Sequence, residues 1–152
     1  VRAHAKQWKI NPARIGILGF SAGGNLDAMT SMHFDKRHYE LIDEIDEVSS
    51  RPDFTILIYT AYLTTADGKL VPEAKVTKQT PPMFMQHAYN DGVTPESSVL
   101  MWLALKQLGV PAEMHITETG GHGYGLRVTD SNSHRWPTRC EQWMRERGLL
   151  NK

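Results

Sequence analysis

Residues 14–25 read Arg-Ile-Gly-Ile-Leu-Gly-Phe-Ser-Ala-Gly-Gly-Asn, and this stretch decides the fold. The run from 15 to 20 is short and apolar and is bounded by turn signals, which indicates a buried β-strand. The pattern Gly-x-Ser-x-Gly follows, centred on Ser21. A serine on a sharp strand-to-helix turn needs small neighbours, so that its hydroxyl stands exposed above the sheet. Because an apolar strand leads into the pattern, we interpret Ser21 as a nucleophile, with a purely structural turn as the alternative.

The rest of the chain alternates apolar runs with helix-compatible segments. The apolar runs are continuous rather than alternating in and out, which favours a parallel sheet covered by helices. We therefore predict an α/β fold, with a charged segment at 35–50 that is a loop or short helix and a long polar loop at 60–82. The expected strands are 14–20, 53–59, 83–87 and 112–117, and the expected helices are 1–9, 25–33, 95–108 and 137–147.

Composition narrows the function classes. A length of 152 residues suits one domain. Seventeen Lys and Arg balance 17 Asp and Glu, and this neutral chain has none of the basic excess typical of a nucleic-acid partner. The apolar runs are too short to span a membrane. The single cysteine, Cys140, excludes an intrachain disulfide framework and a Cys-rich zinc site.

A serine nucleophile needs a base, and seven histidines compete for that role. We interpret His122 as the base, because it lies in Gly-Gly-His-Gly-Tyr-Gly directly after the fourth strand, where side-chain-poor flanks let the imidazole reach another loop. The alternative is a surface histidine in a glycine turn. His87 ends a strand and is expected to be packed in the core. His33, Asp35 and His38 fit no strong zinc pattern, so a solvated polar face is favoured over a metal site.

The base in turn needs an acceptor that fixes its tautomer. Asp91 follows the third strand and lies between Ser21 and His122 in sequence, which is the order expected for an α/β-hydrolase arrangement. All three residues would lie at the carboxyl ends of parallel strands, where open α/β sheets place their sites. The alternative is a turn aspartate before a helix. Asp67 and Asp130 are weaker acid candidates, because neither follows a clear strand.

The backbone next to the nucleophile is the expected anion site. The N–H of Ala22 follows Ser21 at a helix N-terminus, so we expect it to be an oxyanion donor. No segment of the chain stands out as the source of a second donor. This chemistry needs no metal and no organic cofactor.

Taken together, the motifs around Ser21, Asp91 and His122 resemble those of the bacterial acetyl-xylan esterase and lipase-like branch of the α/β-hydrolases. The resemblance implies a serine carboxylic-ester hydrolase that acts on small acyl esters, such as acetyl or feruloyl groups on plant polysaccharide. It also favours a secreted or periplasmic location. Asn90 is a departure, since the family often has a second aspartate there. A serine peptidase or dienelactone-type hydrolase, and an inactive fragment or assembly module, remain as alternatives.

The resemblance also concerns the extent of the domain. In this family the strand before the nucleophile lies mid-sheet, and an upstream half supplies further strands and a His-Gly-Gly loop with an oxyanion donor. The resemblance therefore implies that residues 1–152 are the C-terminal portion of a single α/β-hydrolase domain. The strand at 15–20 would then be a bare apolar edge, and such edges invite pairing with another chain. We expect either a fragment of a longer enzyme or self-association through this edge.

Overall fold

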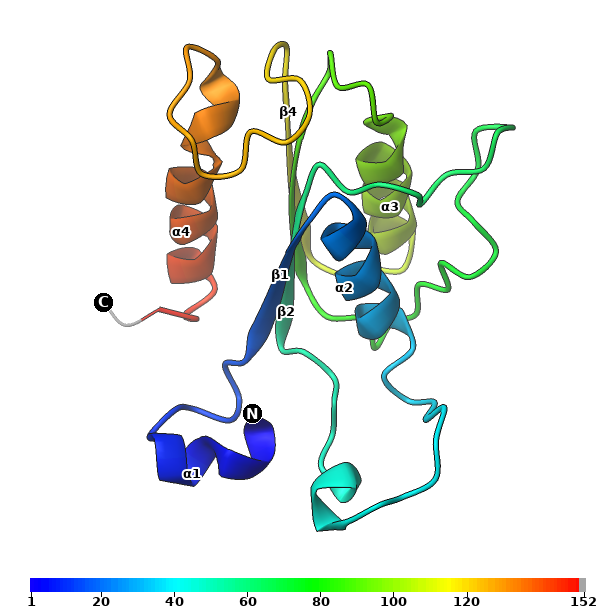
Figure 1. Cartoon of the computed structure of the whole chain (residues 1–152), viewed down its shortest axis with the longest axis vertical. Helices are drawn as coiled ribbons and strands as arrows, with labels where there is room; N and C mark the ends of the chain where they lie inside the picture. The colour runs from blue at the N-terminus through cyan, green and yellow to red at the C-terminus, as the bar shows by residue number, and fades with distance from the viewer. Residues whose placement is uncertain (151–152) are drawn as a thin grey trace.

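A parallel four-stranded sheet organises the protein (Figure 1), whose computed structural model describes residues 1–150. Neighbouring strands are parallel in all three pairs, so their carboxyl ends share one edge of the sheet. The sheet confirms the predicted α/β class and each of the four expected strands. In spatial order the strands are β1 (Gly16–Phe20), β2 (Phe54–Ile58), β3 (Met83–Ala88) and β4 (Ala112–Thr117).

Helices cover both faces of the sheet. Helices α2 (Ala22–Met32) and α3 (Glu96–Gln107) lie on one face, and α4 (Trp136–Glu146) lies on the other (Figure 1). A short helix α1 (Ala5–Trp8) precedes β1. Within residues 1–150 there are also three 3₁₀ turns: η1 (Arg2–His4), η2 (Glu44–Glu47) and η3 (Asn132–Arg135).

Each face of the sheet has its own hydrophobic core. Strands β2 and β3 are buried along their whole length, which explains why their sequences read as unbroken apolar runs. A fully buried large apolar side chain contributes roughly 1.5–3 kcal/mol through its removal from water. The core under α4 is aromatic and includes Phe54, Phe84, Trp136 and Trp143. The core under α2 and α3 is aliphatic and includes Leu57, Met85, Met101 and Leu105.

Helix α2 begins at Ala22, three residues earlier than the sequence predicts. Ser21 makes the turn alone with a φ of 54°, so the two glycines that follow lie inside the helix rather than in a turn. Gly24 is needed there for close packing, because a Cβ atom at this position would lie 2.7 Å from Thr60 Oγ1. Of the two glycines that suggested a longer turn, Gly24 therefore serves the close contact of α2 with the segment that follows β2.

Strand β1 forms one edge of the sheet. Within residues 1–150 it pairs only with β2, in the register that places Gly16 opposite Phe54. The side chain of Leu18 is 45% exposed on this edge. The prediction that this strand is an apolar edge is confirmed for the described part of the chain.

Candidate active site

Ser21 occupies a strained backbone position at the carboxyl edge of the sheet. Its φ of 54° and ψ of −118° are rarely adopted by residues other than glycine and cost of the order of 1–3 kcal/mol. Three hydrogen bonds hold this conformation: the Ser21 N–H donates to Ile58 O at 3.0 Å, and Ser21 O accepts from the N–H groups of Asn25 and Ala61, both at 3.2 Å. Strand β2 and helix α2 thus fix the turn from both sides.

The structure brings the three predicted side chains together. Ser21 Oγ lies 2.8 Å from His122 Nε2. His122 Nδ1 lies 3.0 Å and 2.9 Å from the two carboxylate oxygens of Asp91. The Asp91 side chain is fully buried whereas that of His122 is 34% exposed, so the acid is shielded while the base faces the surface. We call Ser21, His122 and Asp91 the Ser–His–Asp cluster.

The buried carboxylate of Asp91 has donors besides His122. The Val93 N–H donates to Asp91 Oδ1 at 2.7 Å, which closes a turn directly after β3. On the other oxygen, His87 Nε2 lies 3.3 Å from Asp91 Oδ2. His87 is fully buried, as predicted, but its contact with the acid was not predicted. The spacing of four residues between His87 and Asp91, at the end of a strand, was the available signal.

Hydrogen bonds and a ring contact hold the loop that carries His122 in place. Asn90 Oδ1 accepts from the Gly121 N–H at 2.9 Å. The ring of Tyr59 meets the imidazole of His122 edge to face at 5.0 Å, and the Tyr59 hydroxyl accepts from the Gly125 N–H at 3.1 Å. Burial raises the pKa of Tyr59, so this phenol stays neutral beside the base. Sequence reasoning had assigned no role to Tyr59.

Known proteins match this chain in sequence. The family model described as BD-FAE matches residues 1–67, which include Ser21. The acetylxylan esterase of Xylanibacter ruminicola is 29% identical over 141 residues, which cover 83% of this chain and 29% of that protein. The chain thus spans under a third of the length of this relative.

Solved structures match over nearly the whole chain. An acetyl ester-xyloside bifunctional hydrolase from Caldicellulosiruptor lactoaceticus shares 34% identity with a TM-score of 0.89, covering 99% of this chain and 63% of its own. MGS-M1, an α/β-hydrolase enzyme from a Medee basin deep-sea metagenome library, shares 27% identity with a TM-score of 0.75, covering 95% of this chain and 59% of its own. The chain has an α/β-hydrolase fold. The resemblance predicted from the three motifs is confirmed.

In this α/β-hydrolase fold the predicted oxyanion donor lies next to Ser21 in the chain. Ala22 is the first residue of α2 and is exposed. The first N–H groups of a helix have no intrahelical acceptor, and the helix N-terminus carries partial positive charge. The Ala22 N–H, at the residue next to Ser21, therefore has no acceptor within helix α2. Its role as an oxyanion donor remains a prediction.

The weaker candidates of the sequence lie outside the cluster. Asp67 pairs with Lys69 at 2.7 Å on the loop after β2. His33 Nε2 lies 2.7 Å from the carbonyl oxygen of Glu73, so this ring is held by the backbone.

Across residues 1–150, no group of three or more His, Cys, Asp or Glu side chains is arranged to hold a metal ion. None of the helices in that range is both long enough and apolar enough to cross a membrane.

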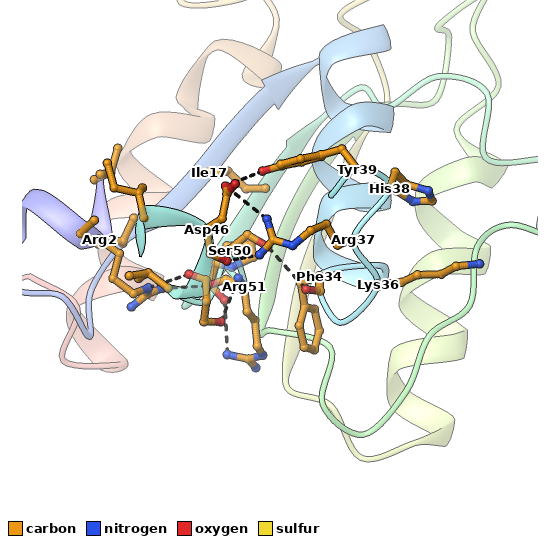
Figure 2. A pocket seen from close by; sticks show the side chains of 17 residues that line it. Arg2, Ile17, Phe34, Lys36, Arg37, His38, Tyr39, Asp46, Ser50 and Arg51 are labelled. Atoms are coloured by element: carbon orange, nitrogen blue, oxygen red, sulfur yellow. Dashed lines mark hydrogen bonds and ion pairs between the residues drawn. The ribbon is translucent and has the colours of Figure 1, made fainter. Parts of the chain in front are cut away.

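A cavity of about 490 Å³ lies at the opposite end of the sheet, among the segments that precede β1 and β2. Figure 2 shows the side chains of Arg37 and Tyr39 turned toward Asp46, whereas that of Lys36 points away from it. Asp46 is at the centre: Arg37 Nη1 lies 3.2 Å from its Oδ1, and the Tyr39 hydroxyl donates to the same oxygen at 2.8 Å. The residues that line this cavity include no member of the Ser–His–Asp cluster, so the cavity is separate from the candidate active site.

Proposed function

We propose that the protein is a serine carboxylic-ester hydrolase that removes small acyl groups through an acyl-enzyme intermediate. The proposal rests on the hydrogen bonds that join Ser21 Oγ, His122 and Asp91. The similarity to an acetylxylan esterase and to an acetyl ester-xyloside hydrolase supports an ester as the substrate. The 152 residues would form the C-terminal portion of a single α/β-hydrolase domain.

In the acylation half-reaction, Ser21 Oγ attacks the ester carbonyl carbon while His122 Nε2 takes the hydroxyl proton. Asp91 holds His122 in the tautomer that accepts this proton and stabilises the imidazolium that results. The Ala22 N–H donates to the oxyanion of the tetrahedral intermediate. Collapse of the intermediate breaks the bond to the alcohol oxygen, which leaves with the proton from His122 Nε2.

In the deacylation half-reaction, a water molecule replaces the alcohol. His122 Nε2 takes a proton from the water as its oxygen attacks the acyl carbon, and the same Ala22 N–H donates to the second oxyanion. Collapse releases the carboxylic acid and returns the proton to Ser21 Oγ. The cycle therefore consumes one ester and one water and needs no other reactant.

Acetyl or feruloyl groups on plant polysaccharide are the substrate class that we propose. The relatives' names, which refer to acetylxylan and to acetyl esters of xylosides, favour acetyl groups on xylan among these. Acylated polysaccharides are too large to enter cells, so we further propose that the protein acts outside the cytoplasm. The His122 side chain is 34% exposed, which is compatible with access by a bulky polymer.

A fluorophosphonate probe and an acetyl ester test the proposal together. We expect the protein to be labelled on Ser21 and to hydrolyse the ester, and we expect Ser21→Ala to lose both while keeping its circular dichroism spectrum. His122→Ala should lower kcat by roughly 10⁴-fold or more, because members of such a triad act as a unit. A folded protein that is neither labelled nor active would support the non-catalytic alternative instead.

A further inference from the structure

A second histidine, besides His122, lies close to the acid of the Ser–His–Asp cluster. His87, on β3, has no exposed surface. Its Nε2 atom lies 3.3 Å from Asp91 Oδ2 and 3.0 Å from the carbonyl oxygen of Val93. Its Nδ1 atom lies 2.9 Å from Ser98 Oγ in the first part of α3. Both ring nitrogens are therefore engaged within the protein.

The partners of the ring determine its tautomer. Nε2 faces only acceptors, the carboxylate of Asp91 and the carbonyl of Val93, so Nε2 carries the hydrogen. Nδ1 then has a lone pair, which accepts the hydroxyl hydrogen of Ser98. Burial lowers the pKa of His87, and this outweighs the opposing effect of the Asp91 charge. The ring is accordingly neutral, and its single Nε2 hydrogen is shared between the Val93 carbonyl at 3.0 Å and the Asp91 carboxylate at 3.3 Å.

We propose that His87 is a positioning residue, which donates from Nε2 to Asp91 Oδ2 and so holds the carboxylate in the orientation that His122 requires. This inference rests on the proposed function. The Val93 N–H donates to Oδ1, and His87 Nε2, whose hydrogen is shared with the Val93 carbonyl, lies 3.3 Å from Oδ2, so each carboxylate oxygen faces an N–H besides that of His122. The carboxylate can then neither rotate about its Cβ–Cγ bond nor present its full charge to His122.

Few other groups near the acid change charge between pH 5 and 8. Tyr59 contacts His122 and Tyr124 packs on Tyr59, and burial raises the pKa of both phenols, so both stay neutral. Arg127 hydrogen-bonds the Gly123 carbonyl and is charged at every pH in this range. Glu96, at the start of α3, is hydrogen-bonded to Thr94. A difference between variants in the acid limb of the pH profile therefore reports on the contacts among His87, His122 and Asp91.

Removal of the donor is the direct test. His87→Met fills much of the ring's volume without a donor, so more of the Asp91 charge faces His122 and favours its imidazolium. The acid limb of the kcat/KM profile, where the base becomes protonated, should move to higher pH by roughly half a unit or more. His87→Gln places an amide N–H near the position of Nε2, and should return the acid limb to the pH seen in the unchanged protein. An unmoved limb in folded His87→Met overturns the proposal.

Two further variants keep the test decisive if His87→Met does not fold. Ser98→Ala retains the ring but removes the hydroxyl that fixes its tautomer, and should move the acid limb in the same direction by a smaller amount. Met85→Val destabilises the same strand without changing a contact of Asp91. The acid limb of its kcat/KM profile should therefore stay at the pH of the unchanged protein. A limb that moves equally in Met85→Val, or does not move in Ser98→Ala, shows that His87 has only a structural part.

A measurement without substrate separates this inference from the proposed function. In ¹⁵N-labelled protein, the His122 ring can be titrated by NMR and its Nδ1–H proton observed directly. We expect the titration midpoint of the His122 ring to be higher in His87→Met than in the unchanged protein and to return in His87→Gln. This result with no ester hydrolysis would refute the proposed function alone, and equal midpoints with normal hydrolysis would refute the role of His87 alone.

Discussion

At the scale of single residues, Asn90 and Asp91, which follow β3, each hold His122 in place through a different contact. Asp91 turns inward to the imidazole of His122, while Asn90 reaches the backbone of the next loop and accepts from the Gly121 N–H. The first contact orients the ring and the second fixes the loop that carries it. Loss of the second contact should therefore reduce turnover without removing any group that takes part in the chemistry.

Asn90→Ala tests this division. A neutral hydrogen bond contributes about 1 kcal/mol to stability, and a small displacement of a catalytic base costs far more in rate than in stability. We expect kcat for an acetyl ester to fall roughly 10- to 100-fold, while the free energy of unfolding falls by about 1 kcal/mol. Steady-state kinetics and urea unfolding measure the two effects.

Asn90→Asp is the matched control. Its carboxylate can still accept from the Gly121 N–H, so kcat should recover most of the loss seen in Asn90→Ala. Equal loss in both variants would mean that the amide of Asn90, and not its acceptor oxygen, is what matters.

The members of the Ser–His–Asp cluster could be predicted because each has a local signal: a glycine-flanked serine, an aspartate after a strand and a histidine among glycines. The contacts that support them could not. His87 meets Ser98 across a turn and a helix start, and Tyr59 meets Gly125 across 66 residues. Such contacts depend on where two distant segments pack, which no local pattern specifies.

At the scale of elements, the junction of β1 and α2 depends on glycines that are not equivalent. A Cβ atom at Gly19 would lie 2.4 Å from the backbone carbonyl of Gly23, which cannot move without unwinding the helix. At Gly23 a Cβ atom would have nothing within 4 Å, and the residue lies inside the helix with no left-handed φ. The sequence motif treats both positions alike, but sterics require glycine only at the first.

Alanine at each position should therefore have opposite effects. Gly23→Ala should raise the free energy of unfolding by about 0.5–1 kcal/mol, because alanine is the better helix former. Gly19→Ala should lower it by several-fold more, about 1–3 kcal/mol or beyond, through overpacking against backbone. Urea unfolding followed by circular dichroism measures both. Similar losses in the two variants would contradict the steric distinction.

The class of the sheet could be predicted from the sequence, but the exact start of helix α2 could not. Unbroken apolar runs indicated buried parallel strands, and β2 and β3 are buried on both faces. The start of α2 was predicted three residues late, because glycines signal turns in sequence. Here the strained Ser21 makes the turn, and Gly24 lies in the helix to admit Thr60. A contact with the side chain of Thr60, just after β2, overrode the local preference.

At the scale of the whole molecule, the exposed edge of β1 bears on assembly. Self-association through this edge remains a prediction. We expect Leu18→Lys to lower the apparent mass of the protein in light scattering, because a charge on an apolar edge opposes pairing. Leu103→Lys is the control, since Leu103 is 40% exposed on α3, which packs on β3 and β4 rather than on β1. A protein that is monomeric at every concentration before mutation would contradict the prediction.

Behind the same edge, Asp27 on α2 links the stability of the whole fold to pH. Its Oδ2 atom is buried and has no hydrogen-bond partner within residues 1–150. Burial raises the pKa of Asp27 from 3.8 to about 6. A group that binds its proton more tightly in the folded state contributes stability that is fully present below its unfolded pKa and is lost as pH rises through its folded pKa.

Asp27→Asn imitates the protonated side chain and should remove this dependence. At pH 4 the two proteins should have similar Tm values, and the variant should become the more stable between pH 4 and 7, as the carboxyl of the unchanged protein loses its proton. Differential scanning calorimetry across this range measures the difference, in which the titration of all other groups cancels. A difference in Tm that is constant with pH would show that Asp27 reaches solvent or a partner, and that its charge costs the fold nothing.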